Sequence, residues 1–265
     1  MTATIRVGLA ALCLALAAVS PARAGTAEGR AAMAGHDYAA AAREFAVAAR
    51  AGDAEGQYLY ATLLKAGYPG VPADAPAAYA WYRRAAEAGY APAQLDLGFM
   101  AFHGEGTAPD RAEGLFWYEK AAAQGLAEAQ YNAGKVYWDG DGVRRDPARA
   151  KTLFEAAAKQ GEPAAQYALG VALSAGSDPD FKAAAAWYGR AAVQGVPAAA
   201  AKLAGLYTLG RGVSTDRTEA LAWAIVGEKG GDPLAAELRA KLEAEGGPGI
   251  AAAARKRAEA LASRP

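Results

Sequence analysis

Apolar and small residues recur along the chain with the spacing of an α-helix. Counting from Gln130, Ala133, Gly134 and Tyr137 follow after three, four and seven residues. Residues at these offsets share one face of a helix. The same arrangement starts at Gln57, Gln94, Gln166 and Ala200. The pattern predicts five helices of similar sequence, each with one face in a core and a small residue at offset four for close helix packing.

A longer spacing relates these helices to one another. Glycines that close apolar stretches stand at Gly52, Gly89, Gly125, Gly161, Gly195 and Gly231, separated by 37, 36, 36, 34 and 36 residues. In the copy that ends at Gly125, an aspartate, Asp110, comes fifteen residues earlier and Trp117 eight residues earlier. Both features recur in register in the other copies. A period of this length indicates a repeat architecture in which each copy stacks on the next.

Each copy is predicted to hold two helices joined by a glycine turn. Gly140-Asp141-Gly142-Val143 illustrates the turn, because glycine can adopt the left-handed conformation that ends a helix. The recurring aspartate then suits the N-cap of the second helix. Trp117 and Trp187 lie at equivalent positions of this second helix, and we expect both in the core.

The motifs Ala-x-Ala-Gln-Tyr-x-x-Gly, Gly-x-Gly-Val, Asp-x-x-x-Ala and Trp-Tyr-x-x-Ala-Ala-x-x-Gly together resemble the Sel1-like repeat, a relative of the tetratricopeptide repeat. The resemblance is to exported bacterial members of the family. It implies an all-α fold, a right-handed α-solenoid of antiparallel helix pairs. The repeats would lie at about 54–90, 91–126, 127–162, 163–196 and 197–232. Residues 25–53 and 233–265 are interpreted as capping helices, with a short helix near 27–34 and a break at 246–249.

The first 24 residues have the features of a secretory signal peptide. Arg6 precedes an apolar run from Val7 to Val19, and Ala22-Arg23-Ala24 offers a cleavage site. The alternative is a membrane anchor, but spanning a bilayer takes about 20 apolar residues. We therefore expect export to the periplasm or beyond the cell, without membrane insertion after cleavage. The chain's only cysteine, Cys13, would leave with this segment.

Composition and motifs give no support for catalysis. The 28 basic and 28 acidic residues balance, so nucleic acid is not an expected partner. His36 and His103 lie in different copies without further ligands at metal spacing, and Asp139-Gly140-Asp141-Gly142 lacks the closing glutamate of a calcium loop. We predict no catalytic residues, no metal site and no cofactor.

A binding surface is predicted on the first helices. In related helical-repeat proteins these helices line the concave side, and offsets 2, 5, 6, 8 and 9 would face it. The candidate residues in the second and third copies are Asp96, Phe99, Phe102, His103, Asn132, Lys135, Trp138 and Asp139. Aromatic residues mixed with charges are typical of protein-binding surfaces. For Phe102 and Trp138, packing against the adjacent second helix is an equal alternative.

Two functions remain open at this stage. The first is a protein-interaction scaffold or adaptor of the cell envelope, which regulates a signalling or assembly complex through protein partners. The second is an envelope enzyme or glycan binder that acts on peptidoglycan or a β-lactam. Fold resemblance does not choose between them. The oligomeric state is also left open.

The export hypothesis predicts the amino terminus of the mature protein. Cleavage after Ala24 would leave a chain that begins at Gly25. Amino-terminal sequencing of protein recovered from the periplasm or the medium should give this residue. Recovery of an intact chain in the membrane fraction would support the anchor interpretation instead.

Overall fold

The structure is a computed structural model that describes residues 21–262, with only the backbone for 21–24. Within these residues the chain forms helices and a single bridge between Tyr68 and Val71. The helices are α1 (Pro21–Ala34), α2 (Tyr38–Arg50), α3 (Ala54–Ala66), α4 (Ala75–Glu87), α5 (Ala91–His103), α6 (Arg111–Ala123), α7 (Ala127–Asp139), α8 (Pro147–Lys159), α9 (Pro163–Ser174), α10 (Phe181–Val193), α11 (Pro197–Leu209), α12 (Arg217–Lys229) and α13 (Pro233–Ala262). The predicted all-α repeat fold is confirmed.

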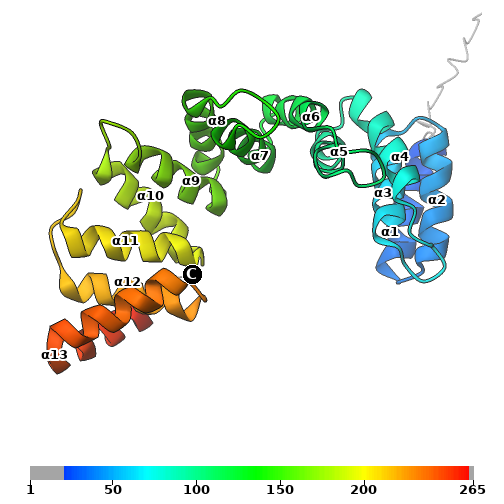
Figure 1. The fold of residues 1–265 in the computed structure, drawn as a ribbon. Coiled ribbons are helices and arrows are strands. Elements are labelled where there is room, and N and C mark those ends of the chain that lie inside the picture. The colour runs from blue at the N-terminus through cyan, green and yellow to red at the C-terminus, as the bar shows by residue number, and fades with distance from the viewer. Residues whose placement is uncertain (1–20, 263–265) are drawn as a thin grey trace, which may run out of the picture.

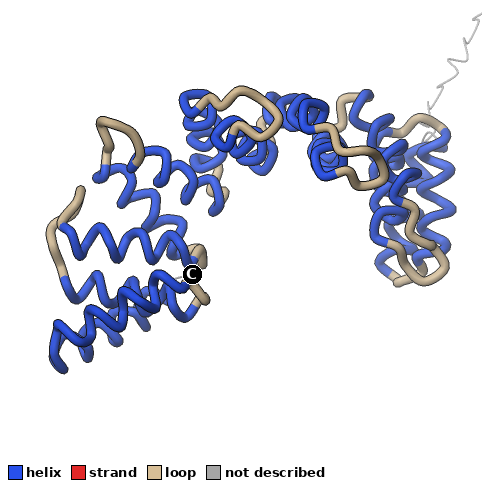
Figure 2. The backbone as a smooth tube through the Cα atoms, viewed as in Figure 1, coloured by secondary structure: helices blue, strands red, loops and turns tan. Residues whose placement is uncertain are grey.

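The helices are arranged as consecutive pairs along an arc (Figure 1). Along the middle of the arc the first helix of each pair, α5, α7 or α9, lies on the inner side, and its partner, α6, α8 or α10, lies on the outer side. The connecting loops gather at the ends of the helices, as the tube in Figure 2 shows. The inner surface is therefore built from first helices, as the family resemblance implies.

Each second helix begins at an aspartate that caps it. The carboxylate of Asp110, for example, accepts a hydrogen bond from the Glu113 amide at 2.9 Å. First helices in three of the pairs end on a left-handed glycine, as at Gly104, where φ is 79°. Both features match the sequence prediction and set the turn between the two helices of a pair.

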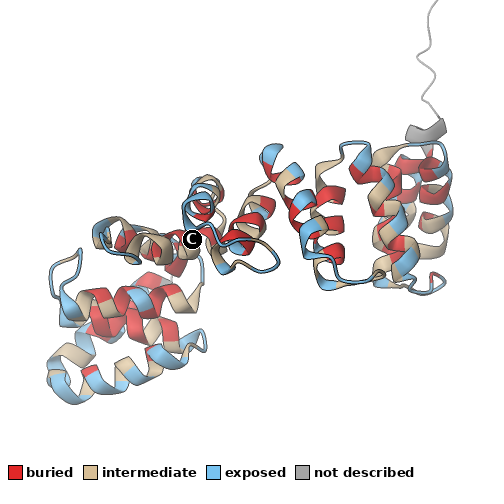
Figure 3. Ribbon diagram, turned by 45° about the horizontal axis from the view of Figure 1, so that its top comes forward, coloured by how far each residue is buried: buried red, intermediate tan, exposed pale blue. Residues whose placement is uncertain are grey.

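The core of each pair forms around one aromatic ring and one glycine. The Tyr118 ring is buried, and a Cβ on Gly98 would lie only 2.8 Å from it. Equivalent contacts join Gly134 to Phe154 and Gly170 to Tyr188. The small residue at offset four thus admits the ring of the partner helix. Buried residues accordingly face the space between helices in Figure 3.

The placement of the recurring tryptophan in the core was only partly right. Trp117 is 8% exposed, but Trp187 is only partly buried and the Arg190 guanidinium lies 4.4 Å from its ring centre. The neighbouring aromatic position is the one that stays buried from copy to copy, as at Tyr188. Successive residues on a helix point about 100° apart, so only one member of the Trp-Tyr pair can face the core fully.

The two caps differ in detail from the expectation. Helix α1 starts at Pro21, before the predicted short helix. At the other end α13 consists of two helices that meet at a kink, as expected, but the break is shorter than 246–249, because only Gly247 leaves the helical conformation, at φ 71° and ψ 173°. One residue with positive φ before Pro248 is enough to kink the chain, since proline fits the first turn of the helix that follows.

Glutamine side chains link the two helices of a pair to each other and to the second helix of the preceding pair. Gln94 donates through Nε2 to the Ala86 carbonyl oxygen at 3.0 Å, and its Oε1 accepts from Nε2 of Gln124 at 2.8 Å. The same link joins Gln160 to Gln130 at 2.9 Å and Gln194 to Gln166 at 2.8 Å. We call this series the glutamine ladder. It satisfies amide groups that lie wholly or partly inside the junction between pairs.

The ladder lacks one member at its amino-terminal end. Oε1 of Gln57 is buried and has no hydrogen-bond partner. Ala88 stands where the later copies have Gln124, Gln160 and Gln194. An unsatisfied buried acceptor costs about 1–3 kcal/mol, so it weakens the packing of the first repeat.

Ala88→Gln should therefore stabilise the protein, by about 1 kcal/mol. The new amide would donate to the free Oε1 of Gln57, and the free energy of unfolding in urea measures the gain. Ala51→Gln is the matched control, because Ala51 closes α2 with nearly the same backbone angles (φ −76°, ψ −1°) as Ala88 closes α4 (φ −74°, ψ 0°). An equal gain in both variants would contradict the ladder and point to helix propensity alone.

Candidate functional site

A pocket of about 180 Å³ opens between α5 and α7 on the inner surface. Six of the eight residues that the sequence predicted line it, together with Tyr118, Val136 and Asp141. The six are Phe99, Phe102, His103, Asn132, Lys135 and Asp139. The candidate residues come from two separate helices, and their side chains meet because α5 and α7 are neighbouring first helices of the arc. We call this site the inner pocket.

One wall of the inner pocket is an aromatic cluster. The His103 ring lies 4.3 Å from Phe99 and 5.2 Å from Phe102, measured between ring centres. Phe99 remains 37% exposed. Cations flank the cluster, with Lys65 Nζ 4.9 Å from the Phe99 ring and the Arg111 guanidinium 5.4 Å from that of Phe102. An exposed aromatic wall of this kind suits an apolar side chain of a partner.

The other wall carries paired charges. Lys135 and Asp139 form an ion pair at 2.8 Å within α7, and Asp141 pairs with Arg111 at 2.5 Å. The hydrogen bond to Asp139 raises the pKa of Lys135 above its ordinary value. All four side chains are exposed, and exposed pairs contribute little to folding stability. These side chains can therefore leave their present ion pairs and bind charged groups of a partner at a small cost in folding free energy.

The other two predicted residues lie outside the inner pocket. Asp96 is half-buried on α5, where burial raises the pKa of its carboxyl group, although Lys65 and the Tyr58 hydroxyl favour the ionised form. Trp138 packs within its own fold, with its ring 6.3 Å from Phe154 and the Arg145 guanidinium over it at 5.4 Å. Trp138 therefore follows the predicted alternative, which is packing against the adjacent second helix. Phe102 both lines the pocket and packs 6.3 Å from Tyr118.

The assignment of offset six to the exposed face was wrong. Met100 and Val136 occupy this offset and are buried, at 0% and 5% exposure. Offset six lies about 60° from offset three around the helix axis, so the neighbouring pair covers it.

Lys65 and Arg111 were not predicted and nevertheless reach the site. Lys65 occupies offset eight of the first copy, the position of Phe102 in the second, so a comparison of three copies could have included it. Arg111 comes from the start of a second helix, and no spacing within the first helices points to it.

The structure brings together no group of three or more histidine, cysteine, aspartate or glutamate side chains that could hold a metal ion, within the residues that it describes. His36 contacts the Tyr38 hydroxyl at 3.1 Å, and the exposed His103 ring lies against Phe99 and Phe102. No helix in the described part of the chain is both long and apolar enough to cross a membrane.

These features define a helical-repeat protein whose inner surface presents aromatic and charged side chains. The model of the Sel1 repeat family matches residues 54–90, 91–126, 127–162, 163–196 and 197–226, and the chain therefore belongs to that family. Sel1 repeat proteins generally mediate protein–protein interactions, and their fold is typically a non-catalytic scaffold. No curated protein matches the sequence.

Two solved structures show the same fold. A Sel1 repeat protein from Oxalobacter formigenes is 27% identical over 89% of this chain and 99% of its own, with a TM-score of 0.71. A protective antigen present in uropathogenic Escherichia coli strains, which displays an SLR fold, is 20% identical over 91% of this chain and 68% of its own, with a TM-score of 0.57.

The raised pKa of Asp96 predicts a pH-dependent effect of Asp96→Asn. An acid whose pKa is raised in the folded state stabilises the fold at a pH below its unfolded value, about 3.9, and loses that contribution as the pH rises through the folded value. Asp96→Asn should therefore raise the Tm at pH 7 and change it little at pH 3. Thermal unfolding at both values measures this, and a lower Tm at pH 7 would show that the charge stabilises the fold.

Proposed function

We propose that this protein is an exported interaction scaffold or adaptor of the cell envelope, and that it binds a protein partner through the inner pocket. The partner inserts an apolar side chain against Phe99 and Phe102 and pairs its charged groups with Lys135, Asp139 and the residues beside them. In this role the protein regulates an envelope signalling or assembly complex. The observation that carries the proposal is the convergence of exposed aromatic and charged side chains from α5 and α7.

The physical character of the pocket supports a protein partner. Aromatic residues supply most of the binding energy at protein interfaces, and surrounding charges set specificity and association rate. The aromatic cluster is held by neighbouring rings and cations, so Phe99 loses little conformational entropy on binding. At about 180 Å³ the pocket suits one inserted side chain better than a whole drug-sized ligand.

Asp96 gives separate support for a binding role. Its carboxylate is kept on the inner surface although burial disfavours the charge. A charge that opposes folding without contributing to the core is a feature of functional sites. A cation from a partner would offset this cost in the complex. The proposal therefore includes Asp96 at the edge of the binding surface.

Support for export comes from the sequence alone. The basic residue, apolar run and small-residue site at 1–24 are typical of signal peptides, and most of this segment lies outside the described residues. No cysteine follows residue 13, so the mature chain cannot form a disulfide within itself. Helix packing alone would therefore stabilise the exported protein.

Phe99→Ala with Lys135→Ala tests the site. Loss of an aromatic anchor commonly costs 2 kcal/mol or more, roughly a thirtyfold drop in affinity. Partners captured from periplasm by the wild-type protein should be retained far less by the double variant, while the Tm stays nearly unchanged. Mass spectrometry of the captured proteins identifies the partner, and titration with that purified partner then gives the affinity.

Phe116→Ala with Lys120→Ala is the matched control. Phe116 is 49% exposed on the outer helix α6, and Lys120 Nζ lies 5.4 Å from its ring centre. This variant removes the same two residue types from the opposite side of the arc and should bind as the wild type does. Equal affinity of wild type and the Phe99/Lys135 variant would place the site elsewhere. A large fall in the Tm of that variant would show that the two side chains stabilise the fold.

A further inference from the structure

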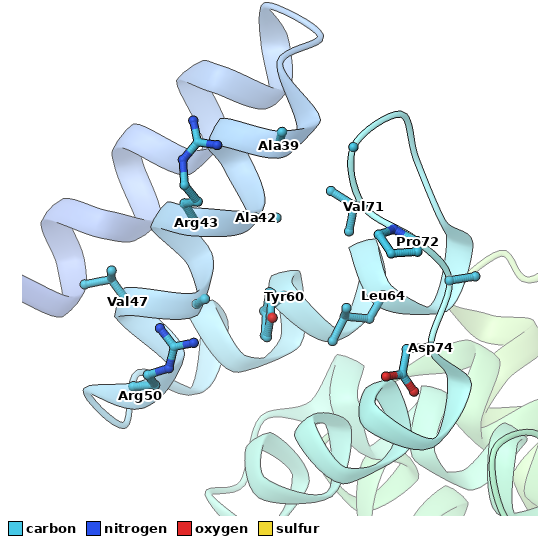
Figure 4. Close-up of a pocket in the computed structure, with 13 residues that line it drawn as sticks. Ala39, Ala42, Arg43, Val47, Arg50, Tyr60, Leu64, Val71, Pro72 and Asp74 are labelled. Atoms are coloured by element: carbon cyan, nitrogen blue, oxygen red, sulfur yellow. The ribbon is translucent and has the colours of Figure 1, made fainter.

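A second and larger pocket lies between α2, α3 and the segment Gly70–Asp74 (Figure 4). Its volume is about 640 Å³, and none of its lining residues belongs to the inner pocket. Alanines of α2 form one wall, and Tyr60 and Leu64 of α3 form the floor. We call it the N-terminal groove.

The N-terminal groove has a counterpart in the third copy. Leu115, Tyr137, Val143 and Asp146 line a hollow of about 510 Å³ at the positions that match Ala42, Leu64, Val71 and Asp74. The N-terminal groove is the larger of the two. Among the described residues no ion pair joins α2 to α4 beside it, whereas Arg83 of α4 pairs with Glu113 of α6 at 2.5 Å.

The floor of the groove is also unusual for its position. Tyr60 stands at offset three of its helix, where the other copies have the buried residues Leu97, Ala133, Leu169 and Leu203. Tyr60 itself is partly exposed, and its ring meets that of Trp81 edge-on at 5.7 Å between centres. An aromatic ring with a polar hydroxyl therefore lines this groove, at an offset where the other copies have a buried side chain.

Two arginines of α2 border the groove. Arg43 and Arg50 are exposed and seven residues apart, which places them on one side of the helix and about 10 Å apart along its axis. Among the described residues neither guanidinium forms an ion pair. The carboxylate that lines the groove, Asp74, lies on the far wall (Figure 4) and accepts a hydrogen bond from the Ala77 amide at 3.0 Å as the cap of α4.

We propose that the N-terminal groove binds an acidic, extended segment of a protein partner. Two carboxylates of that segment pair with Arg43 and Arg50, and an apolar side chain between them lies over Tyr60 and Leu64. In the extended polyproline II conformation residues advance about 3.1 Å each and every third side chain lies on the same side, so carboxylates three residues apart match the spacing of the arginines. Guanidinium groups bind carboxylates through two parallel hydrogen bonds, which favours this ligand class.

The groove provides a second binding site that does not depend on the inner pocket. A partner that reached both would gain affinity through the high effective concentration of its second segment. The two sites can be tested separately, because no residue lines both.

The test uses the purified exported protein and the peptide acetyl-Gly-Glu-Phe-Gly-Glu-Gly-amide as probe, with affinity measured by calorimetry. We expect Arg43→Glu with Arg50→Glu to reduce the affinity at least tenfold. The control Arg217→Glu with Lys241→Glu makes the same change in net charge at exposed positions of α12 and α13 and should leave the affinity within twofold. A peptide with glutamine in place of both glutamates should bind at least tenfold more weakly.

A second variant closes the groove without removing either arginine. Ala42→Trp places a large side chain in the groove, so the peptide should lose its site while the Tm stays nearly unchanged. Phe99→Ala with Lys135→Ala should bind the peptide as the wild type does, whatever becomes of the inner-pocket partner. The proposal is overturned if the charge-reversed or the closed variant retains full affinity, if both charge variants lose affinity equally, or if the glutamine peptide binds as well.

Discussion

The fold depends on the junction between one helix pair and the next. In an arc of stacked pairs each pair contacts only its neighbours, so no distant element can compensate for a poor junction. Here the junction combines packed alanines with the glutamine ladder, in which Gln94 bonds backward to the Ala86 carbonyl and forward to Gln124. A buried amide that is satisfied at both ends fixes the register of successive pairs as well as stabilising them.

This arrangement separates the residues that shape the arc from those that are free to bind. The aromatic ring on Gly98, Gly134 or Gly170 and the capping aspartates recur because every pair needs them. The residues at offsets two, five, eight and nine of the first helices are not needed for packing or capping. Phe99, Lys135 and their neighbours can therefore meet the needs of a partner while the scaffold remains unchanged. The N-terminal groove follows the same principle, since Arg43 and Arg50 are exposed on α2 and form no ion pair among the described residues.

The sequence was sufficient to predict the helix pairs, their caps and most of the inner pocket. The repeat period and the helical offsets show which residues share a helix face. Stacking of successive pairs then brings Phe99 and Asn132 into the same pocket. What it could not provide was the choice between adjacent residues, as with Trp187 and Tyr188, which differ by 100° of rotation on the helix. It also could not provide contacts between copies. Gln124 and Gln160 are visible as repeated glutamines before a glycine, yet each also donates to a carbonyl oxygen of the preceding copy, at Gly89 and Gly125, and only the superhelical path brings these groups together.

The unfilled acceptor of Gln57 has a consequence for how the chain opens. In a linear array the local free energy of opening is set by the single junction that must break, so the pairs need not unfold together. The unsatisfied Oε1 of Gln57 lies in the first repeat, next to the amino-terminal cap, whereas α12 and α13 pack closely at the other end. Fraying is thereby directed to one terminus, and amide hydrogens of α1 to α3 would exchange with solvent before those of the central helices. The two ends of the protein thus differ in local stability, although the repeats are nearly regular in sequence. The amino-terminal end opens first, and the carboxyl-terminal end stays packed.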